Sequence, residues 1–346
     1  MVKAEGYGHG LLPIVRFAAS ELKIKEFGCA TLGEARLLRE ELPDLDYEVY
    51  VFSDVQIEFP RCFEIYLNQR VIPVLSTIET LEFVLKSPDF KFFPLVLKFN
   101  TGMNRLGLDY LELEKVIKLL KTHGRQSINH LITHFACSAS EIDGKSMTVT
   151  QYDRFKDLKK TFQASGISIE KTSVSNSGAI EQGFGLEESH VRPGIMMYGP
   201  TCLNPELRSK SLWTGKNIST LETYIIHTLK IKKGMPVGYG ARTVNEDGVV
   251  AYLALGYGDG FSTRYDGATL MHNNHQGKIF GRVNMDMAQV FFPQSAVSAI
   301  KTGERFEIWN HDVQSILNFS DQTKTIPYEL VCSSTSRVPR HYQFKS

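Results

Sequence analysis

From Met1 to about Tyr198, short β-rich apolar runs alternate with longer stretches in which apolar residues recur at helical spacing. The pattern predicts seven strands, at Phe27–Ala30, Tyr47–Phe52, Val71–Leu75, Pro94–Phe99, Asn129–Phe135, Ile169–Val174 and Gly194–Tyr198. It predicts helices between them, at Leu11–Leu22, Leu32–Glu41, Thr77–Lys86, Leu111–His123 and Gln151–Ala164. This rhythm is typical of a parallel α/β fold.

Two of the predicted helices open with the spacing of a capping box. One box pairs Thr31 with Glu34, and the other pairs Ser76 with Glu79. If Met1–Lys3 is the end of a further strand, the strand count becomes eight, which favours a TIM-like (β/α)8 barrel over an open sheet. Catalytic groups of such a barrel lie at the carboxyl ends of its strands.

After Trp213 the helical spacing disappears. Further β-rich runs follow, at Glu222–Ile231, Val249–Leu255, Lys278–Phe292 and Glu304–Trp309. The segment Asn204–Asn217, with its Pro, Ser and Gly, has the composition of a linker. We therefore expect an α/β barrel over residues 1–213 and a C-terminal all-β domain over residues 214–346.

Composition narrows the class of partners. The chain has 39 Lys and Arg against 38 Asp and Glu, so nothing in its charge would draw it to nucleic acid or an anionic membrane. Its apolar runs are too short to span a bilayer, and no basic-then-apolar leader opens it. The 5 cysteines are scattered without a CxxC pair, which argues against both a disulfide framework and a metal site. These features favour a cytoplasmic enzyme.

Several charged residues stand where strands are predicted to end. Lys3 lies in VKAEGYGHG, and a lysine at the mouth of a barrel can lose enough hydration to become a nucleophile. In LKFNTGMNRLGL, Lys98 ends a strand and Arg105 follows it. An arginine there can hold a carboxylate through two hydrogen bonds. His134 in THFA occupies a similar strand end.

Glycine-punctuated segments supply further candidates. SNSGAI offers the Ser177 hydroxyl and backbone amides at a helix start, which suit a phosphate. HVRPGIMMYG places Arg192 before a Pro-Gly turn. VGYGART, GYGDGF and GRVNMDM in the β domain carry Tyr239, Tyr257 and Asp286. Each motif by itself is equally compatible with an ordinary turn or a solvated surface.

Taken in order, the motifs resemble the alanine racemase family from Lys3 to Arg340. They are VKAxxYGHG, TGMNRLG, THFA, NSG, RPGIMMYG, GYGxRT, GYGDG, NMDM, IPYEL and RVPR. The resemblance implies a pyridoxal-phosphate barrel followed by a β domain. It also implies a homodimer in which each active site combines the barrel of one subunit with the β domain of the other.

The resemblance assigns roles to single residues. Lys3 matches the family's cofactor lysine, and Tyr239 matches the tyrosine that the partner subunit contributes on the opposite face of the cofactor. Those implied to hold the cofactor, besides Lys3, are Tyr7, His134, Ser177, Arg192, Gly194 and Ile195. Those implied to bind the substrate or line its entrance are Arg105, Tyr257, Arg264, Met285, Asp286 and Ser336. Lys98 matches a lysine that many members carry as a carbamate.

The implied chemistry is consistent with this placement. Racemisation removes a proton from one face of a planar carbanion and returns it on the other, so it needs two bases, one for each face. The family links the tyrosine to the cofactor's ring nitrogen through residues that match His134 and Arg192. An arginine keeps its own proton and leaves that nitrogen unprotonated.

The sequence departs from the family at three positions. Lys3 stands almost at the start, where members usually have some thirty preceding residues, so we expect the reading frame to extend upstream. Glu5 replaces an asparagine. Ser336 replaces a tyrosine that crowds the substrate side chain.

The resemblance predicts interconversion of L- and D-alanine, which supplies D-alanine for cell-wall peptidoglycan. Ser336 favours an alternative within the class, a broad-specificity racemase acting on serine or larger amino acids. A barrel-type amino-acid decarboxylase has the same two-domain plan but relies on a partner cysteine motif that is not found here. A non-enzymatic cofactor-binding barrel would lack the β domain.

Overall fold

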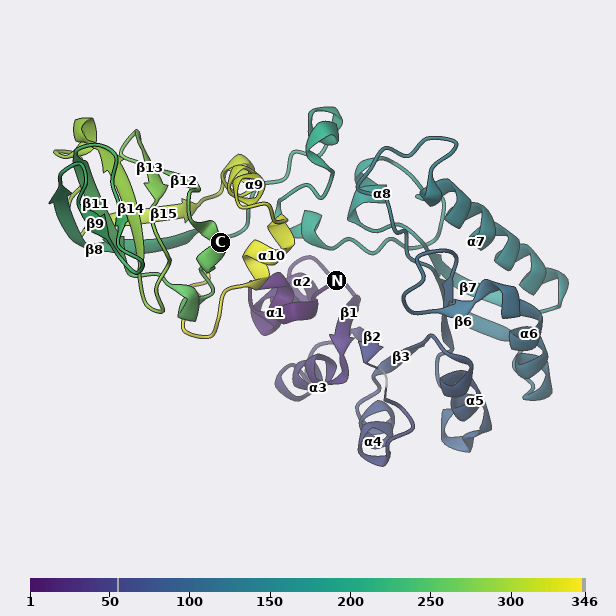
Figure 1. Cartoon of the computed structure of the whole chain (residues 1–346). Coiled ribbons are helices and arrows are strands. Elements are labelled where there is room, and N and C mark those ends of the chain that lie inside the picture. Colours follow the sequence, from purple (N-terminus) through teal and green to yellow (C-terminus); the bar gives the residue numbers. More distant parts are fainter. Residues whose placement is uncertain (55, 344–346) are drawn as a thin grey trace. The chain divides into compact units, whose positions relative to one another are not determined.

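The computed structural model describes residues 1–54 and 56–343 (Figure 1). The chain folds into two compact units. The first, which we call the barrel unit, comprises Met1–Met197 and Thr201–Trp213. The second, the β unit, comprises Tyr198–Pro200 and the chain from Thr214 onward.

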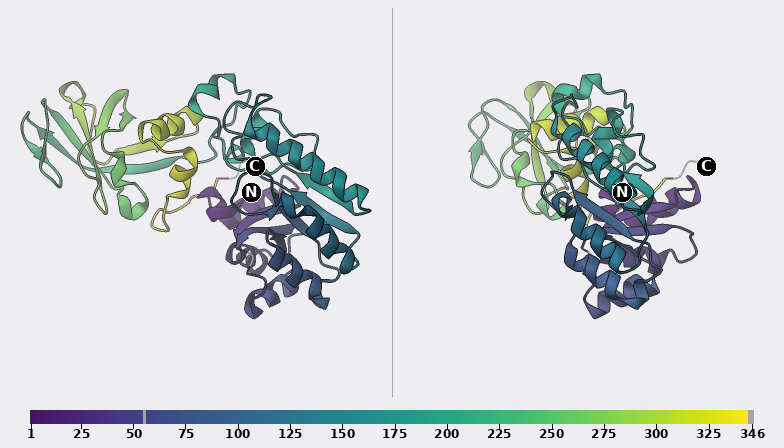
Figure 2. Two further views of the ribbon diagram at one scale, coloured as in Figure 1. Left: turned by 45° about the vertical axis from the view of Figure 1, so that its right-hand side comes forward. Right: turned by 90° about the vertical axis from the view of Figure 1, so that its right-hand side faces the viewer.

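The barrel unit is built on a parallel sheet, with strands in the order β1-β2-β3-β4-β6-β7 and the short β5 beside β4. The strands are β1 (Glu26–Thr31), β2 (Glu48–Asp54), β3 (Ile72–Leu75), β4 (Val96–Asn100), β5 (Leu108–Asp109), β6 (Ser127–Ile132) and β7 (Ser168–Ser173). The helices of this unit are α1 (Lys3–Tyr7), α2 (Leu11–Ser20), α3 (Leu32–Glu41), α4 (Pro60–Asn68), α5 (Ile78–Lys86), α6 (Leu113–Thr122), α7 (Met147–Ala164) and α8 (Ser177–Glu181). Helices α3 to α7 lie on the outer side of the strands (Figures 1 and 2).

Alternate residues of the strands face two different apolar layers. Val51 on β2 and Leu97 on β4 pack with helix residues in the large outer core. Their neighbours in sequence, Tyr50 and Val96, pack with Ile132 in a separate cluster inside the ring of strands. A strand whose successive side chains point to opposite faces explains this division. Inward-facing residues near the strand ends are therefore aimed at the barrel mouth.

The strand predicted at Gly194–Tyr198 is wrong, because Ile195–Tyr198 forms a 3₁₀ helix, η3. The Ser177 hydroxyl accepts a hydrogen bond from the Gly194 amide at 2.8 Å, and that amide is thereby withdrawn from strand pairing. The strand end predicted at Met1–Lys3 is wrong too, because Lys3 opens the short turn α1.

Single contacts close the ring where these strands were expected. Ser173 on β7 forms a parallel bridge with His190. The Met1 nitrogen donates to the Pro193 carbonyl at 3.0 Å. The Val2 amide donates to the carbonyl of Gly28 on β1 at 2.9 Å. The barrel plan is thus confirmed, with extended segments in place of two regular strands.

The β unit is an antiparallel sheet with strand order β12-β13-β14-β11-β8-β15 and a separate hairpin of β9 and β10. Its strands are β8 (Leu221–Ile231), β9 (Pro236–Val237), β10 (Arg242–Thr243), β11 (Gly248–Leu253), β12 (Thr269–His272), β13 (His275–Ile279), β14 (Ala288–Pro293) and β15 (Arg305–Trp309). The predicted C-terminal β domain is confirmed, and the structure shows its strands to be antiparallel, although the run expected at Lys278–Phe292 is divided between β13 and β14. Helices α9 (Val313–Gln322) and α10 (Pro327–Cys332) were not predicted.

The helix caps test the local predictions. Glu34 and Thr31 form the capping box expected at α3. The capping box expected at Ser76 is wrong, because Thr77 caps α5 by accepting from the Thr80 amide.

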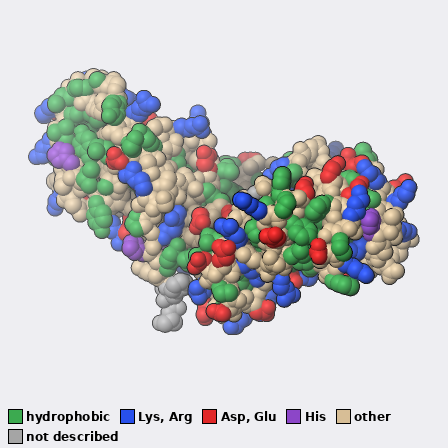
Figure 3. Space-filling model, turned by 90° about the horizontal axis from the view of Figure 1, so that it is seen from below, with side chains coloured by type: hydrophobic (Ala, Val, Ile, Leu, Met, Phe, Trp, Pro, Cys, Tyr) green, Lys and Arg blue, Asp and Glu red, His purple; other side chains and the backbone are tan. Residues whose placement is uncertain are grey.

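Within the described chain no helix has the length and apolarity needed to cross a membrane. Acidic and basic side chains are intermixed on the face seen in Figure 3, in keeping with the balanced charge of the sequence.

Candidate active site

Lys3 stands at the start of a left-handed turn. Residues 4–7 all have φ between 52° and 59°, a conformation that costs about 1–2 kcal/mol for each residue with a side chain. The Gly8 amide closes the turn on the Ala4 carbonyl at 2.8 Å. Such strain is retained where the surrounding structure fixes it, and it is common at functional sites.

The carboxylate of Glu34 ties this turn to β1. One oxygen accepts from the Ala4 amide at 2.6 Å, and the other accepts from the Ala30 amide at 2.8 Å and the Thr31 amide at 3.2 Å. Ala30 and Thr31 end β1. The turn that begins at Lys3 is therefore tied to the carboxyl end of β1, although Lys3 does not end a strand of its own.

Tyr7, Ser177 and Gly194 meet at one point of the barrel mouth. A Cβ added to Gly194 would lie 2.6 Å from the Tyr7 hydroxyl, so only glycine lets the two approach. The Ser177 hydroxyl, at the start of α8, contacts the amides of Gly194 and Met196 at 2.8 and 3.5 Å. Ile195 between them is fully buried. Hydroxyls and clustered amides of this kind suit a phosphate.

The Arg192 side chain spans the ends of β6 and β7. Its guanidinium donates to the Ser173 hydroxyl and to the backbone carbonyls of Thr133 and Val174. Burial lowers the pKa of Arg192 to about 10, which still leaves it charged at neutral pH.

Four cationic side chains converge around His134. The pKa of His134 is lowered to about 3, chiefly by burial and then by the charges of Arg192, Arg105, Lys98 and Lys3. Lys98 is buried on β4, and its pKa falls to about 8 through burial first and then through Arg105, Arg192 and Lys3. A neutral histidine thus stands within a concentration of positive charge. Such a site favours an anionic ligand.

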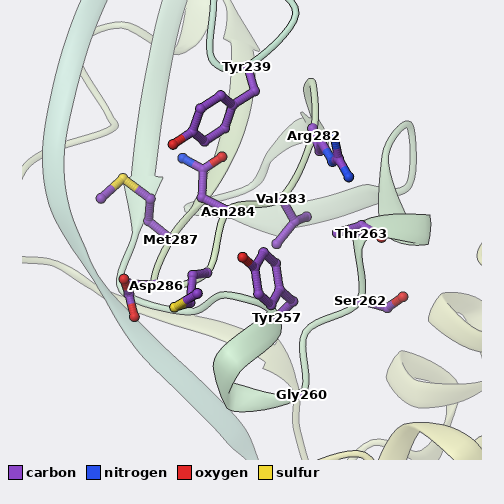
Figure 4. Close-up of a pocket in the computed structure, with 11 residues that line it drawn as sticks. Tyr239, Tyr257, Gly260, Ser262, Thr263, Arg282, Val283, Asn284, Asp286 and Met287 are labelled. Carbon is purple, nitrogen blue, oxygen red and sulfur yellow. The ribbon is translucent and has the colours of Figure 1, made fainter.

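The β unit contains an open hollow of about 930 Å³ (Figure 4). Tyr239 and Tyr257 face the same space from opposite sides, with Asn284 between them. The remaining lining residues are Gly260, Ser262, Thr263, Arg282, Val283, Met285, Asp286 and Met287. Two predicted β-domain residues, Met285 and Asp286, therefore share one hollow with both tyrosines.

Tyr239 projects from the turn between β9 and β10. Glycines flank it on both sides, and Gly238 and Gly240 have φ of 61° and 83°, which glycine adopts at little cost. The phenol is 71% exposed within the chain. This turn holds Tyr239 at an exposed position of the β unit.

Arg337 pairs with Asp286, one of the residues that line the hollow. Its guanidinium pairs with Asp259 at 3.2 Å and with Asp286 at 2.9 Å. The two carboxylates raise the pKa of Arg337. Asp259 in turn accepts from the Gly256 amide at 2.8 Å and so caps the 3₁₀ turn that carries Tyr257. The turn that carries Tyr257 is thereby linked to Asp286 through Asp259 and Arg337.

Two predicted residues lie beside the hollow and do not line it. Arg264 is exposed in the short 3₁₀ turn that follows Thr263. Ser336 is exposed between Thr335 and Arg337. Both belong to the β unit.

Two family models match most of the chain: the alanine racemase N-terminal domain over residues 1–202 and the alanine racemase C-terminal domain over residues 218–342. The chain belongs to the alanine racemase family. The alanine racemase of Hahella chejuensis is 32% identical over 353 residues, which cover 99% of this chain and 90% of that protein. The alanine racemase of Rickettsia bellii is 30% identical, over 99% of this chain and 80% of that protein.

A solved structure extends the likeness to three dimensions. The crystal structure of alanine racemase from Bartonella henselae with covalently bound pyridoxal phosphate is 28% identical and superposes with a TM-score of 0.82. The superposition covers 99% of this chain and 91% of the Bartonella henselae chain. As a member of the alanine racemase family, the protein is an enzyme of the isomerase class.

Sequence reasoning missed several residues of the candidate site. Glu34 was noted as a helix cap, and nothing in the sequence says that its second oxygen reaches Ala4. Arg282 and Asn284 lie in the quoted segment GRVNMDM, and Arg337 lies in RVPR. All three stand in motifs visible in the sequence, but only the fold shows that Arg282 and Asn284 line the hollow and that Arg337 pairs with Asp286.

Proposed function

We propose that this protein is an alanine racemase that uses pyridoxal phosphate, with Lys3 as the cofactor lysine. The observation that carries the proposal is the convergence of Lys3, Lys98, Arg105 and Arg192 around a neutral His134. A site with this charge accommodates an anionic cofactor together with the carboxylate of an amino acid. We propose further that the product D-alanine serves peptidoglycan synthesis in the cytoplasm, a compartment that suits the free cysteines.

The residues at the barrel mouth fit the cofactor. Tyr7, Ser177, Gly194 and Ile195 would hold its phosphate, because the bare Cα of Gly194 leaves room beside the Tyr7 hydroxyl that a side chain would fill. Arg192 would face the ring nitrogen. Since its pKa of about 10 keeps the guanidinium protonated, Arg192 can only donate to that nitrogen.

Bound pyridoxal phosphate supplies an electron sink that makes the Cα proton of an amino acid acidic. We assign the proton on one face of Cα to Lys3 and the proton on the other face to Tyr239 of the partner subunit. His134, which is neutral at physiological pH, can accept or donate a hydrogen bond between Arg192 and that tyrosine.

The substrate carboxylate is assigned to Arg105 and the backbone amide of Met285. A protonated Lys98 facing Arg105 would be repulsive. A carbamate on Lys98 would instead attract Arg105 and hold it in place, and the low pKa of Lys98 favours the neutral amine that reacts with carbon dioxide. Tyr257, Arg264 and Asp286 would line the substrate entrance, and Ser336 would border the substrate side chain.

We propose a homodimer with shared active sites. The cofactor-binding domain would span residues 1–213, and the domain spanning residues 214–346 would supply Tyr239 to the other subunit. The outward presentation of Tyr239 on a glycine-flanked turn supports this arrangement. The small-molecule partner is the amino acid itself.

Two measurements test the proposal. Borohydride reduction of the protein loaded with pyridoxal phosphate, followed by peptide mapping, should label the N-terminal peptide at Lys3. A racemisation assay on a panel of L-amino acids should show loss of optical rotation without release of carbon dioxide. Label on another lysine would overturn the assignment of Lys3, and release of carbon dioxide would favour a decarboxylase.

A further inference from the structure

A buried polar column lies inside the barrel behind Arg192. One end nitrogen of the Arg192 guanidinium donates to the hydroxyl of Ser173 at the end of β7. The same hydroxyl lies 2.9 Å from Nε2 of His130 on β6. His130 is 5% exposed and is therefore an interior residue.

The proton count of this column fixes one of its two hydrogen bonds. A guanidinium has only donors, so the Ser173 hydroxyl accepts from Arg192. A hydroxyl has one proton and two lone pairs, so Ser173 either donates to Nε2 of His130 or accepts a second hydrogen bond from Nε2–H, according to the tautomer of the imidazole. In both cases His130 holds the hydroxyl that receives the Arg192 guanidinium.

The surroundings of His130 support the neutral form. The pKa of His130 is lowered to about 3, chiefly by burial and then by the charges of Arg192, His190 and Lys171. Its ring meets Tyr50 edge to face at 6.1 Å and lies 5.4 Å from the ring of His190. His190 Nε2 is in turn 3.4 Å from Glu26. The imidazole is thus held between two rings, with Nε2 toward Ser173.

An apolar side chain at position 130 would destabilise the fold less than this histidine does. In the part of the chain that the structure describes, Nδ1 of His130 is buried without a hydrogen-bond partner. An unsatisfied buried polar atom destabilises a fold by about 1–3 kcal/mol, so a purely structural role for this histidine is unfavourable. The hydrogen bond between Nε2 of His130 and the Ser173 hydroxyl is therefore the interaction that explains a histidine here.

We propose that His130 is a positioning residue for Arg192 and acts through the hydroxyl of Ser173. The Thr133 carbonyl holds the other end nitrogen of the guanidinium. Together the two contacts fix the guanidinium plane against β6 and β7. The proposal rests on the proposed function, in which Arg192 faces the ring nitrogen of pyridoxal phosphate.

The test uses Ser173→Ala, His130→Phe and the double variant, each prepared in the full chain. His272→Phe is the matched control, because His272 is a buried histidine of the β unit that stacks on Phe306 at 4.8 Å and contacts Glu304. For each protein we would measure the dissociation constant of pyridoxal phosphate, the absorbance spectrum of the bound cofactor, kcat and KM separately, and the urea midpoint.

Ser173→Ala and His130→Phe should each weaken cofactor binding by about 5- to 20-fold and shift the absorbance band. The first removes a hydrogen bond of the guanidinium, and the second removes the partner that orients the Ser173 hydroxyl. The double variant should be no worse than the more affected single variant. Ser173→Thr should restore wild-type behaviour. His272→Phe should lower the urea midpoint without moving the band.

An unchanged dissociation constant and spectrum in Ser173→Ala would overturn the proposal, as would effects that add in the double variant. Ser173→Ala removes a single atom, so it answers the question even if His130→Phe does not fold. If the wild-type protein itself bound no pyridoxal phosphate or racemised no amino acid, the proposed function would fail first, and the two failures are therefore distinguishable.

Discussion

The backbone amide of Ala4, the residue after Lys3, donates a 2.6 Å hydrogen bond to the carboxylate of Glu34. The other oxygen of the same carboxylate accepts from the amides of Ala30 and Thr31. One side chain therefore caps helix α3 and fixes the strained turn that follows Lys3.

Glu34→Ala should destabilise the protein by about 1–2 kcal/mol through loss of the cap and should also weaken pyridoxal-phosphate binding. Urea denaturation would measure the first effect, and a cofactor titration the second. Thr77→Ala removes a comparable cap from α5 and is the control. If both variants lost stability and neither lost cofactor affinity, Glu34 would be a helix cap only.

Tyr239→Phe should lower racemisation by about 10²- to 10⁴-fold, because a positioned base is removed from one face of the substrate. Exchange of the α-proton of L-alanine in deuterated water should fall far more than exchange from D-alanine, which the proposal assigns to Lys3. Tyr224→Phe, at an exposed tyrosine of β8, should leave both exchange rates unchanged. Equal losses from the two enantiomers would contradict the assignment of faces.

Lys98 should make the stability of the cofactor-free protein depend on pH. Its pKa is about 8 in the folded protein against 10.5 when unperturbed, so the unfolded chain binds more protons between these values. The free energy of unfolding should therefore rise as pH increases from about 8 to about 10. Lys98→Met should reduce that slope in urea denaturation at several pH values. A slope equal to that of the wild type would show that Lys98 is not buried as described.

Carbamylation of Lys98 is a separate prediction. Isotopically labelled bicarbonate should give a carbamate signal in the carbon NMR spectrum of the wild type, and Lys98→Met should lack it. Lys98→Met should also raise KM for alanine more than it lowers kcat, because it would leave Arg105 without its anchor. A wild-type spectrum free of the signal would rule the carbamate out.

The parallel barrel strands were largely predictable because buried apolar runs flanked by amphipathic helices leave few alternatives. Gly194–Tyr198 shows where that reasoning ends. Its apolar composition favours a strand, but the Gly194 amide donates its hydrogen bond to the hydroxyl of Ser177, which is 17 residues away in the chain. Local sequence does not report a tertiary hydrogen bond.

Some residues of the candidate site were visible in the sequence and others were not. Lys3 and Arg192 were named as candidates from sequence motifs, although the strand end expected at Lys3 is a left-handed turn. His130 and Ser173 could not be identified from the sequence, since each stands in a predicted strand with no motif around it. Their relationship exists only after β6 and β7 pair, with Ile132 beside Ser173 and His130 beside Lys171.

Ser336 should widen the range of substrates. Its backbone is anchored on both sides, because Thr335 donates to the Gly258 carbonyl at 2.9 Å and Arg337 pairs with Asp286. A tyrosine introduced at this position would therefore stay close to the turn that carries Tyr257, whereas the serine leaves the space open. Pocket contacts discriminate one methylene by about 1–3 kcal/mol, so Ser336→Tyr should increase the preference for alanine over a longer amino acid by tens- to hundreds-fold. We would compare kcat/KM for alanine, serine and a longer amino acid, with Ser298→Tyr as a control at an exposed position remote in sequence. Equal discrimination by the wild type and Ser336→Tyr would mean that another residue, for instance Tyr342, closes the pocket.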